Sequence, residues 1–511
     1  MKFVKQSLKS GLSVSRRCTK HRRVKNVYRC NLALANFILL LAASGGCVEQ
    51  SNPGSTPADP RRSSVVQLYE ECAPSAVDMT GYSPNPAGYY DIGVGSGTVI
   101  HEDGYILTAN HVARDELGGP PNMVHFENGK DYRYRIFKRL GDDIALVKID
   151  VDQRLKPMKL GRSSSLVPGE PIIIIGNPKG FRHTVVPGII AGLNRDGPEV
   201  FIPGMIQVCA PINGGNSGGP VINAEGELVG VIQSMMETAD NIGFAVPLDH
   251  IRRRCTERMA LERSRGLWHG MTVDPSDVAQ VVDVREGSPA ARAGVKQGDV
   301  IRRAGSLSVR DSIHFCLAVA ELQEGDVLPL ELERRGRTMK LSLTVERLPG
   351  RPAEAISGLI NGLDFTVYRG EWKNLPDFDK LTPGRTGHTD TIPGQAWEEE
   401  TGPFALKLTG YIEVPTNGVF NFYVSSDDGS KLWIGDRLVV DNDGLHGAVE
   451  RDGWIVLDKG LHPITVDFFE AGGAKSLAVS YDGPEIGKRM LPANILFRKP
   501  AAQSGNTATG G

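Results

Sequence analysis

Residues 214–220 read Gly-Gly-Asn-Ser-Gly-Gly-Pro, and this short stretch governs the interpretation of the whole 511-residue chain. A serine hydroxyl becomes a useful nucleophile only with a base beside it and hydrogen-bond donors for an oxyanion. Glycines around Ser217 let the backbone turn so that amide N–H groups face one pocket. We therefore expect the N–H groups of Gly215 and Ser217 to be the donors. Taken alone, the motif is also typical of a glycine-rich hairpin turn.

Two upstream segments offer partners for that hydroxyl. His111 follows the apolar run 104–109, where a rigid base would be mounted, and Asp143 directly precedes the apolar run that begins at Ile144. A carboxylate next to such a run is expected to be buried, and a buried charge needs a partner such as a histidine N–H. A structural histidine and a strand-capping aspartate are the plain alternatives. Together the three residues predict a His111–Asp143–Ser217 catalytic triad.

The segments GSGTVI, TANHV, DDIALVKI and NGGNSGGPV resemble the HtrA/Deg branch of the chymotrypsin-like (trypsin-like) serine peptidases across nearly all of residues 90–250. The resemblance implies a chymotrypsin-like double β-barrel of two six-stranded barrels, in a chain that is mainly β. It gives His111 the role of base and Ser217 that of nucleophile. Asp143 rather than Asp142 takes the orienting role, because the family places it directly before Ile-Ala-Leu. A homotrimer is implied by the resemblance only.

The same resemblance suggests how the site selects substrates and how it is activated. Asn216 stands where digestive relatives carry an Asp that pairs with a freed N-terminus, so we expect activation by loop ordering. Ile212 offers no charge at the expected floor of the substrate pocket, and Ile242 and Gly243 flank it. These residues predict cleavage after small or medium aliphatic residues. Cys209 replaces a family Asp and is expected to be a buried structural thiol, with a redox role as the alternative.

Residues 262–348 predict a small α+β module. In 288–294 the order Ser, Pro and a final Gly predicts one short helix, and 311–322 has helical spacing of apolar residues. The module resembles a PDZ domain, which implies binding of a peptide as an added strand, with its carboxylate held by backbone N–H groups. A purely structural module is the alternative. His269 replaces an aliphatic residue of most relatives, so weaker or pH-dependent binding is expected. The matching carboxylate loop is Trp268, His269, Gly270 and Met271.

Residues 358–498 alternate aromatic and β-branched residues with polar ones, which predicts a second all-β domain. The stretches 426–432 and 462–471 resemble the protective-antigen-type (PA fourteen) domain, a β-sandwich. In sugar-binding members of that family an adjacent Asp pair ligates calcium, so Asp427 and Asp428 are the candidate metal ligands. Many members keep this turn only for folding. Proteolysis itself is expected to need no cofactor.

Residues 1–47 predict a signal peptide. The first 30 residues carry ten Lys or Arg and no Asp or Glu, and an apolar run of about a dozen residues follows, where spanning a bilayer takes roughly 20. Cys47 follows small residues and resembles a bacterial lipobox, although Ser44 departs from that pattern. We expect export to the periplasm or cell envelope, with any membrane attachment through a lipid anchor on Cys47. A plainly cleaved signal, a secreted protein or an uncleaved anchor are the alternatives.

The remaining boundaries complete the prediction. Linkers are expected at 48–65 and 349–357, a trypsin-like serine protease unit at 66–255 and a disordered tail at 499–511. The net charge of −2 gives no reason to expect a nucleic-acid partner. We predict an exported HtrA-like serine endopeptidase acting on misfolded envelope or surface proteins, with PDZ peptide sensing and a C-terminal glycan- or partner-docking module. The alternative is a catalytically silent adhesin or scaffold that binds carbohydrate or protein through its C-terminal domain.

Overall fold

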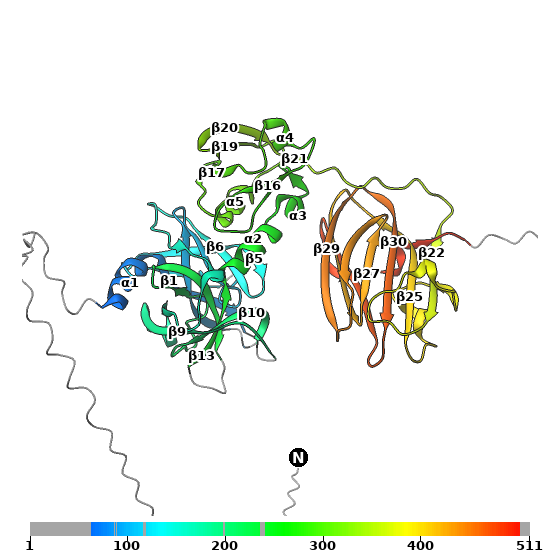
Figure 1. Ribbon diagram of the computed structural model, residues 1–511, viewed down its shortest axis with the longest axis horizontal. Coiled ribbons are helices and arrows are strands. Elements are labelled where there is room, and N and C mark those ends of the chain that lie inside the picture. Colours follow the sequence, from blue (N-terminus) through cyan, green and yellow to red (C-terminus); the bar gives the residue numbers. More distant parts are fainter. Residues whose placement is uncertain are drawn as a thin grey trace, which may run out of the picture. The chain divides into compact units, whose positions relative to one another are not determined.

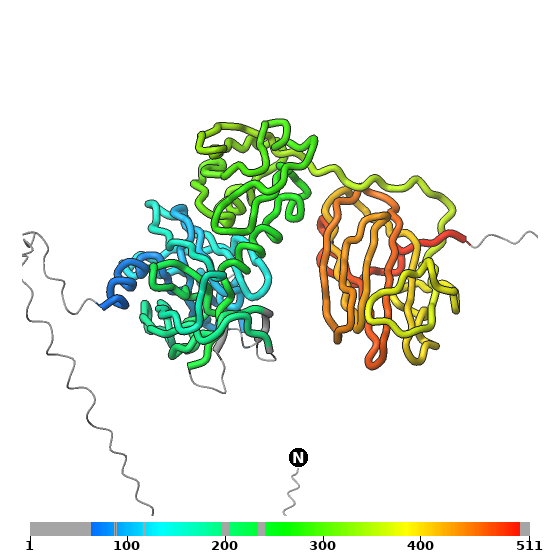
Figure 2. Tube along the Cα trace, in the orientation of Figure 1, coloured from blue at the N-terminus to red at the C-terminus, as the bar shows by residue number. Residues whose placement is uncertain are grey.

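The computed structural model describes residues 63–500, apart from residues 86, 88, 116–118, 198–199 and 236–240. The predictions made for the signal peptide, Cys47, most of the first linker and nearly all of the C-terminal tail lie outside the described residues. None of the helices within the described part is long and apolar enough to cross a bilayer. Figure 2 follows the backbone through the two barrels, the α+β module and the C-terminal sandwich.

The first barrel closes through six strands in the order β1-β2-β3-β6-β5-β4. Helix α1 (Ser64–Cys72) precedes it and begins at Ser63, whose side chain accepts a hydrogen bond from Val66 N–H. Strands β3 and β6 are almost entirely buried, as their continuous apolar runs require. The strands are β1 (Ala76–Pro84), β2 (Tyr90–His101), β3 (Tyr105–Ala109), β4 (Met123–His125), β5 (Asp131–Gly141) and β6 (Ile144–Ile149).

The second barrel also closes through six strands, because β11 pairs with both β8 and β12. A short seventh strand, β7, lies at the edge of β12. The prediction of two six-stranded barrels in a mainly β chain is therefore confirmed. The strands are β7 (Lys159–Leu160), β8 (Pro171–Gly176), β9 (Thr184–Gly197), β10 (Val200–Cys209), β11 (Pro220–Ile222), β12 (Glu227–Met235) and β13 (Ile242–Pro247).

Two helices follow the barrels, α2 (Leu248–Arg258) and α3 (Leu261–Arg265). The charged sequence 250–265 predicts one surface helix, and this prediction is wrong. The side chains of Leu248, Ile251 and Cys255 lie on one face of α2 and are buried in the same core as residues of helix α5. Helices α2 and α5 are labelled in Figure 1.

The α+β module contains the two predicted helices. Ser288 caps α4 (Pro289–Ala293) through Ala291 N–H, and Gly294 ends it with φ of 87°. Asp311 caps α5 (Ser312–Val319) through Ile313 N–H. The strands are β14 (Leu267–Trp268), β15 (Met271–Val273), β16 (Val281–Val284), β17 (Val300–Ala304), β18 (Leu307–Ser308), β19 (Val327–Arg334), β20 (Arg337–Thr344) and β21 (Glu346–Arg347).

The C-terminal domain consists of an eight-stranded and a four-stranded sheet, with apolar side chains of both in one core. Its strands alternate buried and half-exposed residues, as in β26, where Phe420, Phe422 and Val424 point inward. The first sheet has β22 (Ile360–Asn361), β23 (Leu363–Arg369), β24 (Thr386–Thr389), β25 (Phe404–Val414), β27 (Ser430–Ile434), β28 (Arg437–Asn442), β30 (Gly460–Glu470) and β33 (Leu496–Arg498). The second has β26 (Gly418–Asp427), β29 (Val449–Leu457), β31 (Ser476–Gly483) and β32 (Ile486–Met490).

Candidate active site

His111 and Asp143 meet at one edge of the first barrel. Ala109 at the end of β3 pairs with Ile144 at the start of β6, so the residues just beyond these ends lie side by side. His111 Nδ1 lies 2.6 Å from Asp143 Oδ2, and the His111 backbone N–H donates to Asp143 Oδ1 at 2.9 Å. The carboxylate therefore fixes both the main chain and the ring, and accepts a hydrogen bond from the Nδ1–H. Nε2 is left as the acceptor that a general base needs.

The neighbouring carboxylate of Asp142 serves a different purpose. Its Oδ2 lies 2.7 Å from His250 Nε2 and 2.9 Å from Arg254 Nε, both on α2. The hydrogen bond from His250, together with the nearby Arg254 charge, lowers the pKa of Asp142 below its usual value. Asp142 thus joins the barrel to α2, and the carboxylate beside His111 is Asp143.

Ser217 comes from the second barrel, on the loop between β10 and β11. Its hydroxyl donates to Gln233 O at 3.1 Å, and no hydrogen bond joins it to His111 among the described contacts. Hydrogen bonds of a catalytic site are often completed only when substrate is bound. The structure therefore holds His111 and Asp143 together, with the hydroxyl of Ser217 bonded to a main-chain oxygen.

The loop carrying Ser217 presents backbone donors without a described acceptor, and those of Gly215 and Ser217 are among them. The N–H groups of Gly215 and Ser217 donate to no described acceptor, whereas those of Asn216 and Gly218 are bonded to Asn213 O and Ile232 O. Gly215 has φ of 104°, and a Cβ at this position would collide with Asn177 O. Only glycine fits there. The donors that the sequence assigns to an oxyanion, those of Gly215 and Ser217, are thus both free.

Ser96 on β2 is a contributor to this loop that sequence reasoning missed. Its Oγ donates to Gly215 O at 2.8 Å and accepts from Asn177 N–H at 3.0 Å, and its N–H donates to Ser217 O at 2.9 Å. Ser96 is fully buried, so all three bonds lie out of water. The signal available in the sequence is a serine between glycines in GVGSGTVI, which reads equally well as an ordinary strand.

The predicted pocket residues lie together beside β10. The side chain of Ile212 packs directly on Gly243, so that a Cβ on Gly243 would collide with it. Ile242 and Gly243 pair with Cys209 and Val208. Apolar surface is what this arrangement offers. The expectation of a buried thiol is wrong for Cys209, which is exposed because its side chain points away from the barrel core.

The predicted carboxylate loop of the α+β module is buried and partly self-satisfied. The Nδ1 of His269 accepts a hydrogen bond from Met271 N–H at 3.2 Å, and the ring packs edge-on against Phe315 of α5 at 5.5 Å. Burial lowers the pKa of His269 below its ordinary value. One backbone donor that a bound carboxylate would use is thus occupied by the loop's own imidazole.

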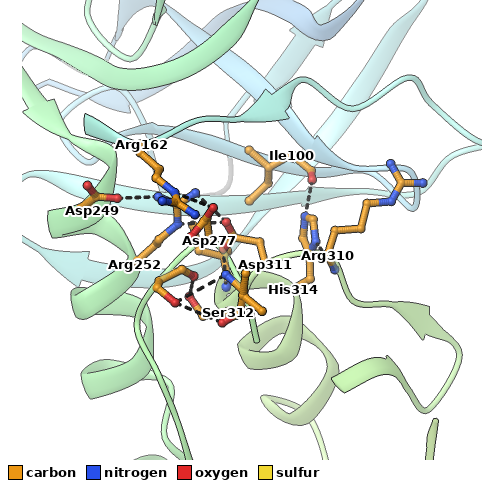
Figure 3. A network of polar contacts seen from close by, with 12 residues as sticks. Ile100, Arg162, Asp249, Arg252, Asp277, Arg310, Asp311, Ser312 and His314 are labelled. Atoms are coloured by element: carbon orange, nitrogen blue, oxygen red, sulfur yellow. Dashed lines mark hydrogen bonds and ion pairs between the residues drawn. The ribbon is translucent and has the colours of Figure 1, made fainter. Parts of the chain in front are cut away.

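A buried ion network joins α2 to the start of α5 (Figure 3). The Arg252 guanidinium is fully buried, with Nη2 2.6 Å from Asp311 Oδ2 and Nη1 2.5 Å from Asp249 Oδ1. Asp249 also accepts from Ser164 N–H at 2.8 Å. A buried charge is tolerated only when it is paired and hydrogen-bonded, and this arginine meets both conditions.

His314 makes a second contact of α5 with the first barrel. Its Nε2 donates to Ile100 O at 2.8 Å, and its Nδ1 accepts from Arg310 N–H at 3.3 Å. One ring nitrogen donates and the other accepts, which is the hydrogen-bonding pattern of a neutral imidazole. The ring of His101 lies edge-on at 5.3 Å. Burial lowers the pKa of both histidines, since a proton would add charge to a dry interface.

Three carboxylates gather in the C-terminal sandwich. Asp427, Asp428 and Glu470 each place an oxygen within 4.8 Å of the others. Asp428 accepts hydrogen bonds from the N–H groups of His446 and Ala471. Burial, with the two aspartates nearby, raises the pKa of Glu470, and its Oε2 has no hydrogen-bond partner. These oxygens suit a hard cation such as calcium. Sequence reasoning missed Glu470, which lies on a strand 42 positions beyond Asp428.

Comparisons with known proteins agree with this three-part organisation. Family models match at residues 95–231 (trypsin-like peptidase domain), 262–345 (PDZ domain) and 382–494 (PA14 domain). The double barrel with a paired histidine and a glycine-flanked serine defines the class of chymotrypsin-like serine proteases. The predicted three-domain resemblance is confirmed.

Individual relatives narrow the class. The chain is 33% identical over 282 residues to a probable periplasmic serine endoprotease DegP-like of Pseudomonas savastanoi, across 51% of this chain and 57% of that protein. A protein of the same name from Pseudomonas putida strain W619 is 31% identical over 332 residues, across 61% of this chain and 68% of that protein. A solved HtrA-type protease AlgW with decapeptide is 25% identical, with a TM-score of 0.33, across 56% of this chain and 99% of that one. The chain belongs to the DegP/HtrA family of serine endoproteases. Its match spans less than two thirds of the length of the first relatives.

The buried ion network gives a stability prediction. Asp311→Asn keeps the cap of α5 but leaves the guanidinium of Arg252 short of a counter-charge, which should cost about 3–5 kcal/mol of unfolding free energy. Asp283→Asn, an exposed carboxylate on β16, is the matched control and should stay within about 0.5 kcal/mol. Denaturant unfolding of the full chain measures both. Equal losses in the two variants would contradict the role given to the network.

The neutral state of His314 gives a pH prediction. The unfolded chain takes up a proton near the ordinary histidine value of about 6.5, but the folded chain resists it to lower pH. The stabilising contact is therefore fully present above about pH 6.5 and is lost as the pH falls towards the lowered folded value. Thermal unfolding midpoints across this window should fall less steeply in His314→Gln than in the wild type. Parallel pH curves would contradict the prediction.

Proposed function

We propose that the chain is an exported serine endopeptidase that hydrolyses peptide bonds of misfolded envelope or surface proteins through an acyl-enzyme on Ser217. The observation that carries the proposal is the 2.6 Å contact of His111 Nδ1 with Asp143 Oδ2. The unused N–H donors of Gly215 and Ser217, on the serine's own loop, support it further. The naming of relatives as periplasmic serine endoproteases supports both the activity and the export.

The chemistry follows from these positions. Ser217 turns from Gln233 O, gives its proton to His111 Nε2, and Oγ attacks the scissile carbonyl carbon. The carbonyl oxygen gains the negative charge and accepts from the N–H groups of Gly215 and Ser217, while Asp143 stabilises the imidazolium. His111 then gives the proton to the leaving amine as the C–N bond breaks. Water repeats the sequence on the ester and regenerates the hydroxyl.

The surroundings support a substrate preference and a form of control. The apolar contact of Ile212 with Gly243, bordered by Ile242, favours small or medium aliphatic residues before the scissile bond. The PDZ-type module would sense peptide carboxylates at residues 268–271. We also retain a lipid anchor at Cys47 and assembly into a homotrimer as parts of this proposal. The lipid anchor rests on the resemblance of the residues before Cys47 to a bacterial lipobox, and the trimer rests on the family resemblance.

Active-site labelling tests the proposal. A fluorophosphonate probe should label the full-length wild type covalently and should leave Ser217→Ala unlabelled, because the probe reacts only with an activated serine hydroxyl. His111→Ala should lower the labelling rate by about 10⁴-fold, the usual loss when a triad member is removed. Peptide mapping checks the labelled position. A wild type that stays unlabelled, with or without added C-terminal peptides, would favour a silent adhesin or scaffold.

A second function is favoured by the carboxylate cluster of the sandwich: calcium-supported docking on glycans or partner proteins. Asp427, Asp428 and Glu470 would hold the ion, which adds positive charge where hydroxyl groups of a sugar can bind. No step of proteolysis depends on it.

Thermal unfolding with and without calcium tests this second function. At a calcium concentration about 100 times the Kd, the folded domain should gain about 2.7 kcal/mol. Glu470→Gln removes one charged ligand and should weaken calcium binding by tenfold or more, about 1.4 kcal/mol. Glu413→Gln, an exposed carboxylate of the same sheet, should bind calcium like the wild type. An unfolding midpoint that ignores calcium would contradict the site.

A further inference from the structure

The loop that carries Gly215 and Ser217, called the oxyanion loop below, contacts a short neighbouring segment, residues 177–183. This segment runs through the 3₁₀ turn η3 (Pro178–Gly180) to the start of β9. Lys179 N–H donates to Gly214 O at 2.9 Å, and Asn177 N–H lies 3.4 Å from Gly215 O. The absence of a side chain on Gly215 is what allows this close approach. The position of the loop therefore depends on where the segment is held.

The far end of the segment is held by a contact between His183 and Asp78 that the proposed chemistry does not use. His183 Nε2 lies 3.4 Å from Asp78 Oδ2 on β1, and the His183 backbone N–H donates to Asp78 Oδ1 at 3.4 Å. The side chain of Asp78 is 1% exposed and that of His183 10%. Neither ring nitrogen of His183 has a hydrogen-bond partner in the described part of the chain, so Asp78 is what this ring faces.

A buried carboxylate needs a compensating charge, and His183 is the group placed to supply it. Burial raises the pKa of Asp78, and the facing imidazole opposes that shift. The other groups around Asp78 are Arg182, which is exposed, Tyr69 of α1, and His125 of β4. The ring of His125 is already bonded, with Nδ1 2.8 Å from an oxygen of Asp131.

The backbone of His183 shows that the contact holds the chain against its own preference. Its φ of 53° lies in the left-handed region, which costs a non-glycine residue about 1–2 kcal/mol. Both the N–H and the ring of His183 reach Asp78 in this conformation. Asp78 pairs in register with Ser96, which bonds the other end of the segment at Asn177. The first barrel therefore contacts both ends of the segment, through Ser96 at Asn177 and through Asp78 at His183.

We propose that Asp78 and His183 are a positioning pair that holds residues 177–183 under the oxyanion loop, and that turnover at Ser217 depends on this hold. The inference rests on the proposed peptidase function and adds two positioning residues to it. Neither residue touches the reacting atoms.

Inactivation kinetics with the fluorophosphonate probe test the pair in the full chain. Asp78→Asn and His183→Gln should each lower the maximal labelling rate by tenfold or more, while the probe concentration for half-maximal rate changes less than about threefold. The double variant should be no slower than the slower single variant, because both changes break one contact. Arg182→Gln, the exposed neighbour, is the matched control and should label like the wild type. Single variants that label at the wild-type rate would overturn the inference.

Hydrogen exchange separates failure of the pair from failure of the enzyme. In both variants the amides of 177–184 and 213–217 should exchange faster than in the wild type, whatever the activity, and Arg182→Gln should leave them unchanged. If wild-type protein is not labelled by the probe, the peptidase proposal fails and exchange still judges the pair. Unchanged exchange in both segments overturns the pair. Should Asp78→Asn lack a cooperative unfolding transition, His183→Gln alone decides, because the side chain of His183 is more exposed than that of Asp78.

Discussion

The chemistry of this chain depends on the antiparallel pairing of β3 with β6. That pairing places Ala109 opposite Ile144, and the two side chains that follow and precede these residues, His111 and Asp143, come together across 32 positions of sequence. Both strands are buried, so a slip of one residue would turn their apolar side chains to the wrong face and separate imidazole from carboxylate. The geometry of the base is thus maintained by burial of the strands behind it.

The nucleophile loop presents the opposite problem, because it has almost no side chains with which to pack. Glycines at 214, 215, 218 and 219 allow the turn but cannot hold it. Hydrogen bonds to Ser96 and Asn177 hold the loop instead of side-chain packing, and those to Ser96 connect the second barrel to a strand of the first. Strand β2 therefore helps to position the Ser217 loop of the second barrel relative to His111 and Asp143 of the first.

Much of the architecture was predictable, because it follows from local rules. The buried runs before His111 and after Asp143, the capped helix at 288–294 and the alternation in the sandwich are each written in consecutive residues. What sequence missed are residues whose importance comes from distant contacts: Ser96 reads as an ordinary strand serine, and Glu470 as the end of a strand. The sequence suggests a surface helix at α2 because charges dominate its composition, although its apolar residues fall on one face and Arg252 pairs with the distant Asp311.

The burial of Arg252 has a consequence for how this protein evolves. The double barrel ends in a helix whose buried guanidinium and apolar face are covered by the next module. The double barrel is therefore not an independent domain. If another domain replaced the α+β module, Arg252 would lose its counter-charge and the apolar face of α2 would be exposed to water. Compensating substitutions in α2 would then be needed at the same time. Recombination among such multidomain proteases should therefore preserve the barrels, α2 and α5 as a single inherited block.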